Sequence, residues 1–487
     1  MLSLVRSVKN SFAPVNRIPP EILSLIPDYC CEDDVDQSLI ALTHVCRGWR
    51  DMFISRSSLW AHLDPTSVDK TYTYIQRSKS SPLDIYLKNR GDTYPDGVFL
   101  LVTPHIHRLK SLTIRSDVLP NGIRHFSYHA PLLEKLDINL TRPNLPVSLF
   151  GRDLSSLREL SLCGVATGLP WNNLANLTTF TLKSCLPKHD FITRLLNFFE
   201  CAPLLHAVVL EDSIPISSDA PPGRIVSLRH LDTLAITARP AHSILLNHLR
   251  IPTGALLVLG ASFNNERSLL RDCLLETSTN LKNLSHITTV NLHFDATRKY
   301  VRLNGPSGGV YVLGNWEDET VPTWITDRRI LRSFSSPIFS TTQRLAVSKY
   351  KPPKPVEVEK CPVFQSLSSM NDLRTLVLTK CHNLPFILAL NPEKNTSKIV
   401  PCPQLEELVL YIKSRDLLHI KPLIGMAKSR ALRNAKLSLI TIIGPDEPAP
   451  AKEELKLREH ITDVDCRVDD ALPDWDDLPY ESGEESE

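Results

Sequence analysis

One short apolar phrase recurs along most of this chain and restricts its fold more than any other feature. In each copy, three apolar residues are separated by two variable residues and then by one. The copies are Leu109-Leu112-Ile114, Leu133-Leu136-Ile138, Leu157-Leu160-Leu162, Leu177-Phe180-Leu182, Leu205-Val208-Leu210, Leu231-Leu234-Ile236, Ile287-Val290-Leu292, Leu373-Leu376-Leu378, Leu405-Leu408-Leu410 and Leu432-Ala435-Leu437, with Leu257-Leu259 as a degenerate copy. Successive copies between residues 112 and 234 are 20 to 28 residues apart. Because one such unit cannot bury its own apolar face, the period predicts a solenoid with one short strand per unit in a curved parallel sheet.

Residues 16–63 follow a different pattern, that of short amphipathic helices. Pro19 and Pro20 suit the start of a helix, where no backbone N–H is needed. One predicted apolar stripe consists of Ile18, Ile22, Leu23 and Ile26, and a second consists of Leu42, Val45, Cys46, Trp49 and Phe53. Because about 45 residues bury little apolar surface alone, the remaining apolar face indicates a partner.

The order of these residues resembles an F-box. The matching positions are Ile18-Pro19-Pro20-Glu21-Ile22-Leu23, Leu42, Val45-Cys46-Arg47, Trp49-Arg50 and Leu59-Trp60. The resemblance implies a three-helix module that docks a substrate receptor onto the Skp subunit of a cullin-type ubiquitin ligase. The repeats behind it are similar to leucine-rich repeats, of the irregular kind found in fungal F-box proteins. We therefore expect Skp-binding residues at Ile18, Pro19, Pro20, Ile22, Leu23, Ile26, Leu42, Val45, Cys46, Trp49 and Trp60.

The predicted domain order follows from these patterns. We expect a flexible N-terminus at 1–15, the F-box at 16–63, the solenoid at 64–444 and an acidic, largely disordered tail at 445–487. Two insertions interrupt the array: a β-hairpin at 299–313 and an extended charged loop at 351–362. The fold class is thus α plus α/β.

Composition indicates a folded protein inside the cell. Of the 487 residues, 42% are hydrophobic and 22% are charged, and the net charge of +1 gives no general attraction to nucleic acid or membrane. The N-terminal residues lack the pattern of a signal peptide, and the apolar run 255–259 is too short to span a membrane. The eleven cysteines include no C-x-x-C pair, which favours free thiols in the cytoplasm, the nucleus or both.

The outward strand positions suggest where a target protein would bind. The candidate substrate-binding residues are Arg115, Lys135, Glu159, Lys183, Glu407 and Tyr411. With Asp137, Glu211 and Lys436 included, basic and acidic residues at these positions are equal in number, so no electrostatic stripe favours nucleic acid. We expect a protein target.

No pattern for catalysis is present in the sequence. We find no phosphate-binding loop, dinucleotide fingerprint, H-E-x-x-H or G-x-S-x-G motif. The group His105, His107, His125 and His129 lacks a cysteine or carboxylate at ligand spacing, and Cys46 belongs to an apolar stripe. We therefore expect no catalytic residue, metal or cofactor. The expected function is substrate recognition in a ubiquitin ligase; the alternatives are a ligase-independent scaffold whose helices cap the solenoid and, more distantly, a hydrolase with an unrecognised site.

Overall fold

The computed structural model of this chain describes residues 12–23, 26, 35–88, 95–117, 120–144, 150, 154–165, 174–185, 190–214, 221, 223–237, 242–261, 287–294, 298–305, 308–315, 339–350, 362–394, 400–412, 419–444 and 451–468. The chain divides into two compact units. The first comprises residues 1–215 and 219–221, and the second comprises residues 216–218 and 222–487. The predicted flexible N-terminus lies mostly outside the described residues, and so does the predicted loop at 351–362 apart from Pro362.

The first unit begins with short helices. They are η1 (Pro14–Arg17), α2 (Pro20–Leu23), α4 (Val35–His44), α5 (Arg47–Ser55) and η2 (Ser57–Trp60). Strand β1 (His62–Leu63) follows at once and pairs in parallel with β2 (Leu83–Lys88). The chain therefore enters the sheet directly after Trp60, so the predicted boundary at residue 63 falls at the end of the first strand.

The sheet of the first unit is parallel from strand to strand. It continues from β2 through β3 (Leu109–Ser116), β4 (Lys135–Asn144), β5 (Glu159–Val165) and β6 (Thr179–Lys183) to β7 (Ala207–Glu211). The middle residues of the apolar phrase stand in register, from Leu112 through Leu136, Leu160 and Phe180 to Val208, and all are buried. This alignment stacks one apolar side chain on the next and forms the core between the strands and their return segments.

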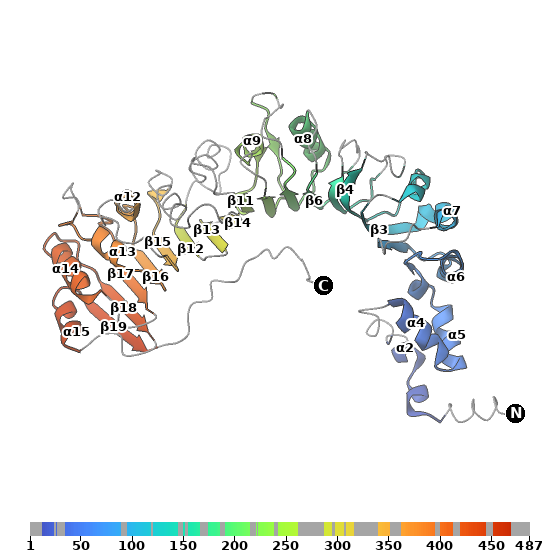
Figure 1. The fold of residues 1–487 in the computed structure, drawn as a ribbon, viewed down its shortest axis with the longest axis horizontal. Coiled ribbons are helices and arrows are strands. Elements are labelled where there is room, and N and C mark those ends of the chain that lie inside the picture. Colours follow the sequence, from blue (N-terminus) through green and yellow to red (C-terminus); the bar gives the residue numbers. More distant parts are fainter. Residues whose placement is uncertain are drawn as a thin grey trace. The chain divides into compact units, whose positions relative to one another are not determined.

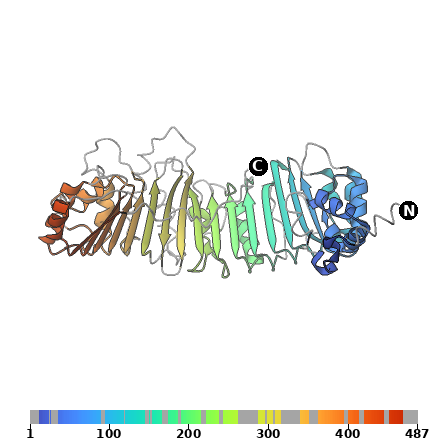
Figure 2. The ribbon, with the colours of Figure 1, turned by 90° about the horizontal axis from the view of Figure 1, so that it is seen from below.

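The return segments of the first unit supply short helices. They are α6 (Val68–Ser78), α7 (Asp96–Val102), η3 (Thr103–Arg108), η4 (Asn121–His125) and α8 (Phe191–Cys201). In Figure 1, α8 lies on one side of the strands, and Figure 2 looks onto the strands from the opposite side. Six apolar residues of α8 are buried, among them Phe198 and Phe199, and the ring centre of Phe198 lies 4.4 Å from that of Phe180 in the sheet.

The sheet of the second unit contains one reversal. The strand order is β9 (Thr233–Thr237), β11 (Leu256–Ala261), β14 (Gly309–Asn315), β13 (Arg298–Asn304), β12 (Thr289–Phe294), β15 (Arg344–Ser348), β16 (Thr375–Thr379), β17 (Glu407–Tyr411), β18 (Leu439–Gly444) and β19 (Asp463–Val468). Among the described strands of this sheet, only β13 runs antiparallel to its neighbours. A small separate parallel pair joins β8 (Val226–Ser227) to β10 (Leu249–Arg250).

The helices of the second unit cover the apolar side of its sheet. They are α9 (His242–Leu246), α12 (Pro362–Ser369), α13 (Leu384–Ala389), α14 (Ile420–Ala431) and α15 (Ala451–Arg458). Arg430 of α14 is fully buried, and its guanidinium donates to the carbonyl oxygens of Pro401, Cys402 and Ala435. These bonds fix the turn before β17 to the end of α14, because a buried guanidinium needs acceptors for its N–H groups.

The predicted mixture of helices with a mostly parallel sheet is confirmed. The hairpin predicted at 299–313 also forms, as β13 and β14, but it is part of the sheet rather than a surface insertion, since β14 pairs with β11. It separates β11 from β12, which the sequence spacing placed next to each other.

Two predictions for the C-terminal part of the chain are wrong, namely the position of one strand and the start of the tail. The phrase Leu432-Ala435-Leu437 lies at the end of α14 and in the turn that follows, and the strand is β18, with Ile440 and Ile442 in the core. The tail predicted from residue 445 is not wholly irregular, because α15 and β19 extend the sheet by one further strand. Val464 is buried in β19, so apolar residues of this segment join the core although acidic residues surround them in the sequence.

Candidate protein-interaction surfaces

The N-terminal helices pack around a small apolar cluster. Leu23 of α2 meets Trp49 and Phe53 of α5, and the rings of Trp49 and Phe53 lie edge to face at 5.6 Å. Ile26, Leu42 and Cys46 are partly buried against this cluster. The cluster therefore uses residues from all three helices and holds them together.

The predicted second stripe is not one helix. Helix α4 ends at His44, and α5 begins at Arg47 with Cys46 in an extended conformation. The Arg50 Nε–H donates to the carbonyl oxygen of Thr43 at 3.0 Å across this break. The break turns Val45 away from the cluster, which corrects its predicted place on the stripe.

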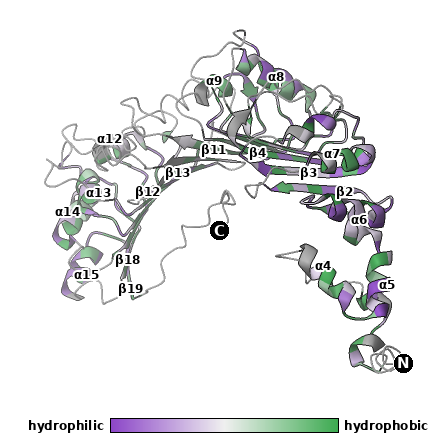
Figure 3. Cartoon of the chain, turned by 45° about the vertical axis from the view of Figure 1, so that its right-hand side comes forward, coloured by the Kyte–Doolittle hydropathy of each residue, from purple (hydrophilic) through white to green (hydrophobic). Residues whose placement is uncertain are grey.

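Several large apolar side chains of these helices remain exposed. The exposed fractions are 36% for Ile18, 54% for Ile22, 46% for Ile40 and 53% for Val45. Ile40 was not among the predicted docking residues, although it stands one residue after buried Leu39 in α4. Figure 3 shows that α4 and α5 each carry both hydrophobic and hydrophilic residues. Exposed apolar groups on a small helical module are available to a partner.

The predicted docking residues thus divide into three groups by exposure. Ile18, Pro19, Ile22 and Val45 are exposed; Ile26, Leu42 and Cys46 are half-buried; and Leu23, Trp49 and Trp60 are buried. Pro20 opens α2, but its side chain lies outside what the structure describes. The buried residues can support a docking face but cannot themselves contact a partner.

Trp60 joins the helices to the sheet-forming part of the first unit. Its ring lies 5.0 Å from Tyr74 of α6, and the Arg77 guanidinium stacks over it at 4.3 Å. With 1% of its surface exposed, Trp60 cannot itself contact a partner. Of the two predicted roles, contact or support of the docking face, only that of a support is open to it, and it connects the helices to α6.

The polar face of the first sheet carries charges that pair across strands. Lys135 lies 3.0 Å from Glu159 and Lys183 lies 3.0 Å from Glu211, while Arg115 is exposed beside Asn139 in the next strand. Each such surface pair contributes about 0–1 kcal/mol to stability. Four of the predicted substrate-binding residues therefore share this face, but three of them are already paired with a neighbouring strand.

The other two predicted substrate-binding residues belong to the second unit. Glu407 and Tyr411 lie on β17 and point to the same side, since four residues separate them in a strand. The carboxylate of Glu407 accepts a 3.1 Å hydrogen bond from the Thr375 hydroxyl. They do not join the first four residues in one described site.

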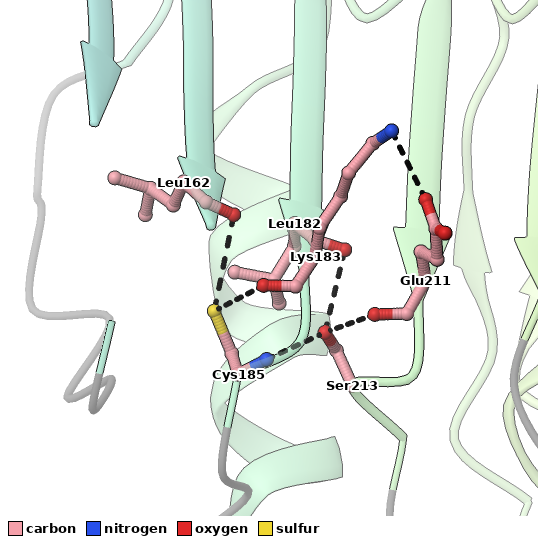
Figure 4. Close-up of polar contacts among 6 residues, drawn as sticks. All are labelled: Leu162, Leu182, Lys183, Cys185, Glu211 and Ser213. Atoms are coloured by element: carbon pink, nitrogen blue, oxygen red, sulfur yellow. Dashed lines mark hydrogen bonds and ion pairs between the residues drawn. The ribbon is translucent and has the colours of Figure 1, made fainter. Parts of the chain in front are cut away.

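The strand ends are closed by thiols and hydroxyls. In Figure 4, the Ser213 hydroxyl accepts from the Cys185 N–H and contacts the Glu211 and Leu182 carbonyl oxygens, and the Cys185 thiol donates to those of Leu162 and Lys183. Cys381 repeats this arrangement after β16, with bonds to Val347 and Thr379. Burial raises the pKa of Cys185 to about 11 and that of Cys381 to about 12. These thiols serve the backbone, and their chemistry is unsuited to nucleophilic attack near neutral pH.

The described residues contain no arrangement typical of a metal site. Within them, no group of three or more His, Cys, Asp or Glu side chains is placed to hold a metal ion. His105 and His107 have ring centres 6.4 Å apart, and burial lowers the pKa of His105. No helix in the described part of the chain combines the length and apolar character needed to cross a membrane.

Comparison with known proteins gives no further assignment. No family model matches this chain, and no curated protein matches it either.

Proposed function

We propose that this protein is the substrate-recognition subunit of a Skp–cullin–F-box type ubiquitin ligase. The observation that carries the proposal is the division of the N-terminal apolar residues. Leu23, Trp49 and Phe53 form an internal cluster, whereas Ile22, Ile40 and Val45 remain exposed on the same small module. A module that satisfies its own core and still exposes branched aliphatic side chains is suited to docking on another protein.

In this proposal the two parts of the chain have different tasks. The N-terminal helices are an F-box that binds the Skp subunit, and the parallel strands with their helical returns form an irregular leucine-rich-repeat solenoid that binds a target protein. The chain itself performs no chemistry. Binding raises the effective concentration of a target lysine near the conjugating enzyme, which accelerates transfer by proximity.

The alternative is a ligase-independent scaffold. The contacts of Trp60 with Tyr74 and Arg77 favour this alternative to a degree, because they attach the helices to the repeat region as a cap would be attached. A cap, however, has no need to leave Ile22 and Val45 more than half exposed.

The test is copurification of the full chain with a coexpressed Skp subunit. Ile22→Asp and Val45→Asp change exposed residues and should abolish copurification while leaving the circular dichroism spectrum unchanged. Val68→Asp is the matched control, since Val68 is an exposed apolar residue of α6 outside the module. Failure of the unaltered chain to copurify, or equal binding by all three variants, would favour the scaffold.

A further inference from the structure

We propose that β19 is the edge through which two copies of this chain dimerise, with the two β19 strands paired antiparallel. Strand β19 is the last described strand of the second sheet, and its six residues pair in parallel with β18. In Figure 1 it stands at the end of that sheet, and no described strand pairs with its other side. An edge strand of this length presents a row of backbone donors and acceptors to another chain. The pairing of the two strands is independent of the proposed function.

The bonds between β19 and β18 identify the backbone groups on the open side of β19. The Asp463 N–H donates to the Ser438 carbonyl oxygen at 2.9 Å, so the N–H and C=O groups of Asp463 face β18. In a strand, the backbone groups of successive residues point alternately to its two sides. The backbone groups of Val464, Cys466 and Val468 therefore face the open side of the sheet.

Charge selects one register for the two strands. In an antiparallel pair, residues whose backbone groups face the edge must lie opposite one another. With Cys466 opposite the second copy's Cys466, Val464 lies opposite Val468, and Asp465 lies opposite Arg467. A shift by two residues in one direction would oppose Asp465 to Asp465, and in the other direction Arg467 to Arg467. Like charges directly opposite each other are destabilising, so the first register is the favourable one.

The two charged residues make β19 complementary to itself. The side chains of Asp465 and Arg467 are 30% and 65% exposed, and Asp465 Oδ2 lies 2.6 Å from Arg467 Nε. A two-fold axis at Cys466 repeats this pair, so that two acidic and two basic side chains alternate across the interface. Opposite charges on facing strands stabilise the pairing. This symmetry favours a second copy of the chain over an unrelated strand as the partner.

The same register extends the apolar core across the edge. Val464 is 2% exposed, whereas Val468, on the same side of β19, is 64% exposed. In the dimer, each Val468 lies opposite the buried Val464 of the other copy. Dimerisation therefore covers an apolar side chain that the single chain leaves in water.

Helix α15 supports the same contact. The Arg458 guanidinium reaches the open side of β19, since it donates to the Val464 carbonyl oxygen at 2.6 Å. Leu455, three residues before Arg458 on the same side of α15, is 65% exposed. A two-fold axis perpendicular to the sheet leaves both helix layers on one side, so the second copy's α15 approaches Leu455. Because a carbonyl oxygen has two lone pairs, Arg458 can keep its bond when a partner strand also donates to Val464.

The first strand of the chain lacks these features. Strand β1 contains only His62 and Leu63, and a very short edge strand gives another chain little backbone to pair with. The β19 pair, by contrast, joins its opposed residues through about six backbone hydrogen bonds. An interface of one strand pair is small, so the dimer should form and dissociate reversibly.

The test is sedimentation velocity of the full chain between about 2 and about 200 µM, where a weak dimer should appear as the concentration rises. Asp465→Arg and Arg467→Asp each place like charges opposite one another and should weaken association by about tenfold or more. An equimolar mixture of these two variants should associate as the unaltered chain does, because each supplies the charge that the other needs. The chain with both substitutions should also regain association. Circular dichroism checks that every variant is folded.

A backbone substitution tests the same edge without a change of charge. Val468→Pro removes an N–H that faces the open side and none that bonds to β18, so it should abolish the dimer and leave the fold intact. Val468→Ala is the matched control, because it keeps the N–H, and it should weaken association far less.

Three results would overturn the proposal. They are a monomer at every concentration, a mixture of the two charge variants that associates no better than either alone, and a dimer that survives Val468→Pro. If the chain stays monomeric and Val468→Pro instead abolishes binding of a target protein, a strand of that target is the occupant and the proposal is equally overturned. Skp copurification is measured separately, so the two proposals can fail independently.

Discussion

The indole Nε1–H of Trp60 donates a 2.9 Å hydrogen bond to the carbonyl oxygen of Phe53. Phe53 lies in the last turn of α5, where carbonyl groups have no partner within the helix. The Trp60 side chain therefore satisfies a carbonyl group at the end of α5. It also packs against Tyr74 and stacks under the Arg77 guanidinium. The N-terminal helices depend on this residue for their attachment to the rest of the first unit.

Substitution of Trp60 should separate its packing from its hydrogen bond. Trp60→Ala should lower the free energy of unfolding by about 3–5 kcal/mol, because it leaves a large cavity. Trp60→Phe retains most of the ring and should cost about 1–2 kcal/mol, mainly through the unsatisfied Phe53 carbonyl. Urea unfolding followed by circular dichroism measures both, and equal losses in the two variants would contradict a role for the packing of the indole ring.

Two glycine substitutions should have opposite effects. Gly164 has a φ of +65°, and a Cβ there would overlap the Leu140 carbonyl oxygen, so Gly164→Ala should destabilise the protein by about 2 kcal/mol or more. Gly425 lies in α14 with open space around it, and Gly425→Ala should stabilise the helix by about 0.5–1 kcal/mol. Thermal unfolding of the two variants provides the measurement, with each serving as the control for the other.

The buried thiols should resist alkylation. With pKa values of about 11 and about 12, Cys185 and Cys381 hold very little thiolate at pH 8. Exposed Cys201 should react with iodoacetamide under these conditions, as mapped by mass spectrometry. Rapid labelling of Cys185 in the folded protein would contradict its position.

The same two thiols should make stability depend on alkaline pH. Their pKa values in the folded state exceed the ordinary value of 9.0, so the folded state favours the protonated form. The contribution of the two protonated thiols to the free energy of unfolding is complete below pH 9. It should decline as the pH rises from 9 toward 12. Cys185→Ser together with Cys381→Ser should reduce this decline in urea unfolding measured at pH 9 and pH 10.5.

Two deletions at the C-terminal end should differ sharply in their effect on the stability of the folded protein. Removal of residues 445–487 deletes α15 and β19 and exposes the edge of β18, so we expect a lower unfolding midpoint and aggregation. Removal of residues 469–487 keeps both elements and should leave the circular dichroism spectrum unchanged. Differential scanning calorimetry of both forms would reveal whether β19 belongs to the folded unit.

Deletions at the beginning should show where the helical module ends. A chain starting at residue 57 keeps Trp60 and β1, whereas a chain starting at residue 64 loses both. Both should lose Skp, but only the longer one should resist limited proteolysis around α6, because Tyr74 and Arg77 keep their partner. Similar proteolysis of the two chains would place the boundary elsewhere.

Much of the sheet could be predicted because its strands repeat one local pattern. Leu112, Leu136 and Leu160 are middle residues of the phrase, and all are buried in neighbouring strands. Ile461, Val464 and Cys466 repeat the same spacing just before and within β19, but the acidic residues around them conceal the pattern. The candidate docking residues were found in the same way, as apolar positions with helical spacing.

The sequence by itself determined which residues are apolar and at what interval, and hence which segments could become strands or amphipathic helices. Only the tertiary structure decided that Trp49 and Trp60 are enclosed while Ile22 and Val45 are exposed, since a helical stripe does not state which of its residues meets a neighbour. It also decided that β11 pairs with β14 instead of β12. Backbone hydrogen bonds join any two strands that are brought together, so the pairing depends on how distant segments pack and not on the local pattern of either strand.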